Sequence, residues 1–202
     1  MANRKWVVAL VIGGVLAFVA VAGAVVVMSW RVIQQAKPVQ DQAPIAEGDK
    51  RLVVTAADLA RIGGPAVDLK AETWTSLRQG NGNRFVLYVY EPASEPGLSL
   101  YSRLVILPDA ASARRMYQMD KITAKLGADG ASHVPAPGLL AGDDRSAWFI
   151  EKDGQRIGVF FLIREGRFLT SARLLGITLD TRDDVDKLLG PMLAESRRRA
   201  SL

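Results

Sequence analysis

The sequence contains no cysteine and a single histidine among its 202 residues. Without cysteine, the chain cannot form disulfides, thiolate nucleophiles, zinc fingers, iron–sulfur clusters or the covalent haem link of c-type cytochromes. One histidine likewise excludes a multi-histidine metal site. We therefore expect no metal and no cofactor, and we do not expect an enzyme.

Negative charge is missing from the start of the chain, since all 21 acidic residues follow residue 40. Arg4 and Lys5 are the only basic residues before Trp30, so the remaining 24 of the 26 basic residues mix with the acidic ones. This mixed surface has no concentrated basic stripe, and nucleic-acid binding is not expected. Hydrophobic residues make up 49% of the chain, which excludes disorder as its dominant state.

The longest apolar run, Val7–Met28, has 22 residues without a charge or a proline. A helix of that length spans about 33 Å, enough for a hydrocarbon core of about 30 Å. Trp6 and Trp30 bracket the run, where indoles favour the two membrane interfaces. These features predict one transmembrane helix within an N-terminal segment, residues 1–30.

A cleaved signal peptide is the alternative, because Ala22-Gly23-Ala24 resembles a cleavage site. The apolar run continues beyond it and is longer than a usual signal-peptide core, which favours an uncleaved anchor. The short N-terminal tail favours a cytoplasmic N-terminus. We therefore expect a single-pass protein of the bacterial inner membrane, with its main domain in the periplasm.

Small residues recur along the expected anchor at spacings that fall on one helix face: Ala9, Gly13, Ala17, Ala20 and Ala24. Such a face lets a second helix approach closely, which drives association in lipid. The alternative is that the pattern merely reflects a chain rich in alanine and glycine. As partners we expect the bilayer and, through this seam, other transmembrane helices or subunits of a membrane complex.

A polar stretch rich in proline and glycine follows the anchor, so residues 31–51 are expected to be a flexible linker. The folded extracytoplasmic domain is then residues 52–202. Thr55 is the expected N-cap of a short first helix. Expected strands cover residues 70–78, 84–91, 98–107, 146–152, 156–164 and 167–177, with helices at 110–126 and 181–199.

This order is α-βββα-βββα, which predicts an α+β fold with helices packed on an antiparallel sheet. Residues 103–117 and 173–189 share a layout: a strand that begins with Arg-Leu, a turn, an aspartate and a helix. The shared layout suggests two tandem βββα units. In element order, residues 52–200 resemble the Mog1/PsbP-like domains. That resemblance implies a small α+β module that binds or assists larger complexes, and it implies no residue roles.

His133 is the single candidate general base, and it lies in a glycine- and proline-rich segment, residues 128–145, that we expect to be a loop. No Gly-x-Ser-x-Gly motif accompanies it, which favours an exposed loop histidine over a hydrolase triad. The acidic cluster Asp180, Asp183, Asp184 and Asp186 is better explained by the dipole of the last helix than by a metal.

Five residues are candidates for a protein interface. Tyr88 and Tyr90 share one face of a strand and would form a docking surface if that face is exposed. Arg197, Arg198 and Arg199 end the last helix, where they could contact an acidic partner or anionic lipid. We expect a non-enzymatic, membrane-anchored accessory, assembly or scaffolding subunit. The alternative is an extracytoplasmic ligand-binding or ligand-sensing domain with residues 128–145 as a lid.

Overall fold

The computed structural model describes residues 38–39, 44–64, 67–127 and 130–201. Its contacts divide the chain into two units. The first consists of residues 1–39 and 79–81, of which the structure describes a two-residue strand, β1 (Pro38–Val39), and residues 79–81. The second, residues 40–78 and 82–202, holds the fold described below. Among the described residues no helix is long and apolar enough to cross a membrane, and the expected anchor, Val7–Met28, lies outside them.

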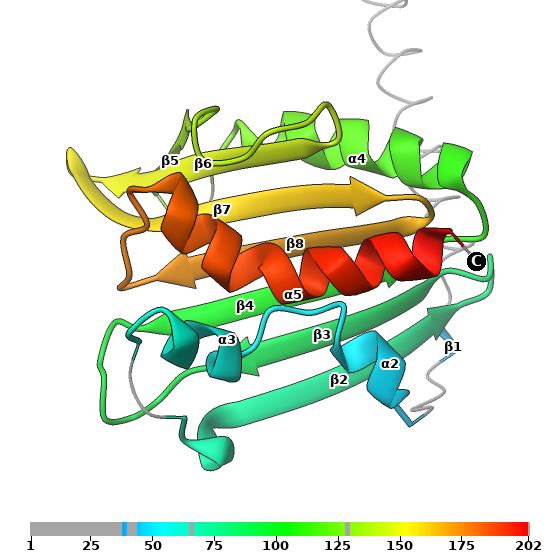
Figure 1. The fold of residues 1–202 in the computed structure, drawn as a ribbon, viewed down its shortest axis with the longest axis horizontal. Helices are drawn as coiled ribbons and strands as arrows, with labels where there is room; N and C mark the ends of the chain where they lie inside the picture. The colour runs from blue at the N-terminus through cyan, green and yellow to red at the C-terminus, as the bar shows by residue number, and fades with distance from the viewer. Residues whose placement is uncertain (1–37, 40–43, 65–66, 128–129, 202) are drawn as a thin grey trace, which may run out of the picture. The chain divides into compact units, whose positions relative to one another are not determined.

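The second unit is built on an antiparallel sheet with the strand order β2-β3-β4-β8-β7-β6-β5 (Figure 1). The strands are β2 (Glu72–Gln79), β3 (Arg84–Tyr90), β4 (Ser99–Ile106), β5 (Ser132–Pro135), β6 (Arg145–Lys152), β7 (Gln155–Glu165) and β8 (Phe168–Leu175). Its helices are α2 (Glu47–Lys50), α3 (Ala56–Arg61), the 3-10 turn η1 (Leu69–Ala71), α4 (Ala110–Ala124) and α5 (Arg182–Ala200). The predicted α+β class with an antiparallel sheet is confirmed.

Local sequence signals explain most of these boundaries. Asp109 is the N-cap of α4, where its carboxylate accepts from the Ser112 backbone N–H at 2.7 Å. The β6–β7 turn has positive φ at both Asp153 and Gly154, as a type I′ Asp-Gly turn requires. At Thr55, the predicted N-cap of α3, the backbone N–H donates to the Asp58 carboxylate at 2.7 Å.

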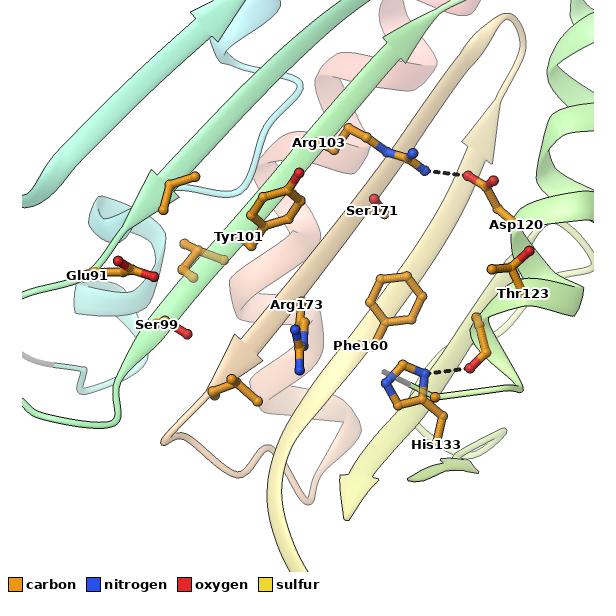
Figure 2. A pocket seen from close by; sticks show the side chains of 15 residues that line it. Glu91, Ser99, Tyr101, Arg103, Asp120, Thr123, His133, Phe160, Ser171 and Arg173 are labelled. Carbon is orange, nitrogen blue, oxygen red and sulfur yellow. Dashed lines mark hydrogen bonds and ion pairs between the residues drawn. The ribbon is translucent and has the colours of Figure 1, made fainter. Parts of the chain in front are cut away.

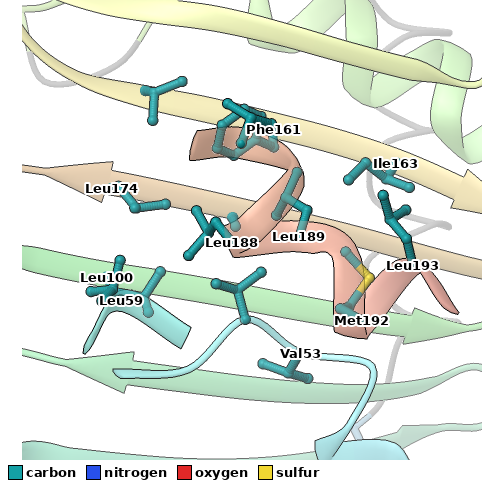
Figure 3. Close-up of a cluster of buried hydrophobic side chains, with 14 of the residues drawn as sticks. Val53, Leu59, Leu100, Phe161, Ile163, Leu174, Leu188, Leu189, Met192 and Leu193 are labelled. Carbon is teal, nitrogen blue, oxygen red and sulfur yellow. The ribbon is translucent and has the colours of Figure 1, made fainter. Parts of the chain in front are cut away.

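Helices cover both faces of the sheet. On one face, α5 contributes Leu188, Leu189, Met192 and Leu193 to the larger core, shown in Figure 3, which also includes residues of α3. On the other face, Ala113, Tyr117 and Ala124 of α4 pack in a second core with residues of β6, β7 and β8. The second predicted βββα unit is wrong in strand number, because four strands, β5 to β8, separate α4 from α5, and these two helices lie on opposite faces of the sheet.

Two predicted boundaries are wrong. The linker ends before residue 51, because residues 47–50 form α2 and Asp49 is 1% exposed within the folded unit. Residues 128–145 are not entirely a loop, because β5 pairs with β6 along Ser132–Pro135. The pairing partner of β5 lies more than ten residues away in sequence, which a local pattern does not reveal.

Candidate functional site

A pocket of about 510 Å³ lies on the α4 side of the sheet. Figure 2 shows it between α4, β5 and the face of the sheet that α5 does not cover. Its lining residues come from five strands, from the residue after β3, from α4 and from the turn after α4: Val89, Glu91, Ser99, Leu100, Tyr101, Arg103, Asp120, Thr123, Ala124, Gly127, His133, Phe160, Ser171, Arg173 and Leu175. The site therefore depends on the complete fold, since no single hairpin supplies its walls.

One end of the pocket is closed by an ion pair between Arg103 of β4 and Asp120 of α4 (Figure 2). Both side chains are partly exposed, so the pair contributes modestly to stability. Its geometric effect is larger, because it holds the helix against the sheet beside the cavity. Arg103 and Arg173 are also the two arginines that open the similar segments 103–117 and 173–189. Folding brings these two corresponding positions to one pocket.

His133 lines the opposite end, where its ring stacks on Phe160 with centroids 5.6 Å apart. Its Nδ1 lies 2.5 Å from the carbonyl oxygen of Ala124. A carbonyl can only accept, so Nδ1 carries the hydrogen in this contact. Nε2 is buried and has no hydrogen-bond partner among the described residues. The predicted exposed loop histidine is thus wrong, because β5 brings this ring against the sheet.

Burial is the main reason why the pKa of His133 is lowered, and the nearby charge of Arg173 lowers this pKa further. The hydrogen bond to Ala124 acts in the opposite direction. The imidazole is therefore neutral at neutral pH, and its Nε2 can accept a hydrogen bond. This places an acceptor, two guanidinium groups and an aromatic face around one cavity.

The neighbouring serine does not form a triad with this histidine. Ser132 alternates with His133 along β5, and its hydroxyl donates to the Glu151 carbonyl at 3.4 Å. Among the described residues, no cluster of three or more histidine, aspartate or glutamate side chains could hold a metal ion. The pocket lining presents hydrogen-bonding side chains beside apolar ones.

The predicted docking surface at Tyr88 and Tyr90 is wrong, since both rings are buried in the α5-side core. The Tyr88 hydroxyl accepts from the Ala56 backbone N–H at 2.9 Å and donates to Glu72 at 3.0 Å. The Tyr90 hydroxyl accepts from the Asp68 N–H at 3.4 Å. Strand alternation turns both side chains inward, where their hydroxyls accept hydrogen bonds from backbone N–H groups.

The three arginines at the end of α5 have different surroundings. Arg199 donates to the carbonyl of Gly48 and to the carboxylate of Asp49, so it stabilises the fold and is not available as an interface residue. Arg198 pairs with Glu195 on the same helix at 2.7 Å. Arg197 is exposed and lies 3.9 Å from Glu165. An external partner for Arg197 and Arg198 stays a prediction.

The predicted seam and interface residues of the anchor lie outside the described residues: Trp6, Ala9, Gly13, Ala17, Ala20, Ala24 and Trp30. Sequence reasoning did not single out Arg103, Asp120, Phe160 or Arg173 as site residues. The signal available was the repeated Arg-Leu strand start, which contains both pocket arginines. Asp120 and Phe160 had no comparable signal, because strand and helix patterns alone do not show which faces meet.

No protein-family model matches this sequence, and no curated protein is significantly similar to it. Among solved structures, the extracellular domain of PknH from Mycobacterium tuberculosis is similar, with a TM-score of 0.49 and 12% sequence identity. The alignment covers 79% of this chain and 98% of that chain. The resemblance to Mog1/PsbP-like domains stays a prediction.

Proposed function

We propose that the chain is a non-enzymatic domain, tethered to the outer side of a membrane, that binds a small organic ligand in the α4-side pocket. The pocket carries the proposal, because it combines about 510 Å³ of space with apolar walls and a few convergent polar groups. The tether is supported by the uncharged 22-residue run, which is long enough to span a membrane.

The walls indicate the kind of ligand. Val89, Phe160 and Leu175 offer contact to an apolar or aromatic body. The ring of His133 lines the cavity, and the guanidinium groups of Arg103 and Arg173 can donate to ligand oxygens. A compact molecule with an aromatic ring and one polar end fits these groups. Phenylacetate and 2-phenylethanol represent its charged and neutral forms.

The test is the thermal unfolding of the full chain in mild detergent, with and without each of these two compounds. A ligand that binds the native state raises the unfolding temperature as its concentration rises. Ser171→Leu adds an apolar side chain to the pocket wall and should abolish the increase. Thr75→Leu, at an exposed position of β2, is the matched control. It should leave the ligand-induced rise in unfolding temperature unchanged. If neither compound raises the unfolding temperature, or if both variants behave alike, ligand binding in this pocket is wrong.

An accessory subunit is the second candidate, and one observation favours it. Leu77 of β2 and Tyr101 of β4 are 38% and 45% exposed on the same face of the sheet. Exposed apolar residues on one face are a common feature of docking surfaces. Leu77→Lys should then reduce co-purification with larger membrane proteins in mild detergent. If the variant co-purifies with the same proteins as the unchanged chain, Leu77 is not part of a docking surface.

A further inference from the structure

Helix α4 projects large apolar side chains into solvent. Met119 and Ile122 are 69% and 64% exposed, and Leu126, just past the helix, is 81% exposed. Their spacing places them along one line, which we call the α4 ridge. The buried residues Ala113, Tyr117 and Ala124 lie on the other side of the helix. A surface helix normally has the reverse arrangement, with polar residues facing water.

Positive charge flanks the α4 ridge. Arg114, Arg115, Lys121 and Lys125 lie in or directly after the helix, whereas Asp120 is its single acidic residue. Asp120 is already paired with Arg103 of the sheet, so it does not neutralise the outer face. A hollow of about 760 Å³ runs beside the ridge, with Arg114, Arg115 and Met119 among its lining residues.

We propose that the α4 ridge docks on an anionic lipid surface, with Met119, Ile122 and Leu126 inserted between headgroups. Apolar side chains flanked by arginine and lysine are the usual composition of a helix that lies in a membrane interface. The cations are attracted to anionic headgroups, and the hollow beside the ridge has room for one. A convex ridge suits a deformable bilayer better than it suits a rigid, flat protein surface.

The predicted anchor makes weak docking effective. Sixteen residues, 31–46, separate the expected N-terminal segment from α2. A tether of that length holds the domain at a high local concentration next to the bilayer, so a few exposed side chains suffice for attachment. This inference does not depend on ligand binding in the pocket, and either can fail alone.

The absence of cysteine allows a direct test, because one introduced cysteine carries a unique label. The full chain with Ile122→Cys is labelled with a fluorophore that lipid-borne nitroxides quench. It is then reconstituted in phosphatidylcholine vesicles with or without phosphatidylglycerol. The matched control is Asp183→Cys, an exposed position on α5 at the opposite face of the sheet. We expect quenching at position 122 in anionic vesicles and none at position 183.

Charge reversal tests the electrostatic part. Arg114→Glu combined with Arg115→Glu should lower the docked fraction by about tenfold or more, since each cation near an anionic surface contributes favourably. Both positions are exposed, so circular dichroism and the unfolding temperature should stay unchanged. Equal quenching at positions 122 and 183, no quenching at 122, or quenching that survives charge reversal would overturn the proposal.

Discussion

At the scale of single residues, Asp49 shows how one buried carboxylate joins distant parts of the chain. It lies in α2 at 1% exposure and pairs with Arg84 of β3 and Arg199 of α5. Both arginines retain some contact with water, so removing the carboxylate leaves them partly solvated. The ion pairs therefore act as a structural link between α2, the sheet and the end of α5.

Asp49→Asn should lower the free energy of unfolding by about 2–3 kcal/mol, less than the loss of a fully buried pair, because the arginines can reach solvent. Glu47→Gln, which removes the exposed pair with Lys50, is the control and should change stability by less than about 1 kcal/mol. Urea unfolding of both variants measures the difference. Equal effects would mean that the Asp49 pairs behave as surface pairs do.

His133 makes the folding stability of the domain depend on pH, and the direction of this dependence follows from its pKa shift. Its pKa is lowered in the folded state, chiefly by burial, so the unfolded chain binds the proton more readily. The neutral imidazole contributes fully to the free energy of unfolding when the pH is above 6.5, the pKa of histidine in the unfolded chain. This contribution is lost as the pH falls through the lower pKa of the folded state.

The unfolding temperature should therefore decline between about pH 7.5 and 5.5, a range that few other side chains titrate in. His133→Gln removes the imidazole and should flatten this decline, since the chain has no other histidine. Differential scanning calorimetry of both proteins across this pH range measures the decline in unfolding temperature. Parallel curves for the two proteins would assign the decline to other groups.

At the scale of elements, Gly158 marks a close contact between β7 and β8. A Cβ built on Gly158 would lie 2.0 Å from the carbonyl oxygen of Leu174, so no larger residue fits without a backbone shift. The position follows an irregularity in the β6–β7 pairing, where Glu151 pairs with Arg156 and Ile150 with Gly158. Glycine here permits the strands to pair next to that bulge.

Gly158→Ala should destabilise the fold by about 2–3 kcal/mol because the strand must move to accept one methyl group. Gly138→Ala is the matched control, since a Cβ at Gly138 meets nothing within 4 Å. Urea unfolding measures both changes. A small effect at Gly158 would mean that β7 can shift without loss of its pairing with β8.

Most strands and helices were predictable because their signals are local. β3, for example, was expected at 84–91 and is observed at Arg84–Tyr90, since aromatic and β-branched residues run between two turn signals. The four-residue strand β5 was missed, because it is short, mostly exposed and flanked by glycine and proline. Its pairing with β6 is a long-range contact that composition does not encode.

At the scale of the whole molecule, the expected anchor seam is a prediction about assembly. Gly13→Leu with Ala17→Leu keeps the segment apolar, so insertion should be normal, but the larger side chains separate the packed helices. We expect this double variant to reach the membrane and to lose its partners during purification in mild detergent. Mass spectrometry of the co-purified proteins measures that loss.

Val11→Leu with Val15→Leu adds bulk off the seam and is the control. If both double variants retain the same partners as the unchanged chain, the row of small residues reflects composition alone. Binding would then depend on the folded domain, and Leu77 and Tyr101 would be the first positions to change.

The sequence by itself determined the α+β class, the order of the elements other than α2, η1 and β5, and most of the turns, because alternation, capping residues and Asp-Gly pairs act over a few residues. Only the tertiary structure decided that α4 and α5 cover opposite faces of the sheet and that Tyr88 and Tyr90 point inward. It also decided that Arg103, His133 and Arg173 meet at one pocket. These features arise from contacts between segments far apart in the chain, where the gain from burial depends on which faces pack together.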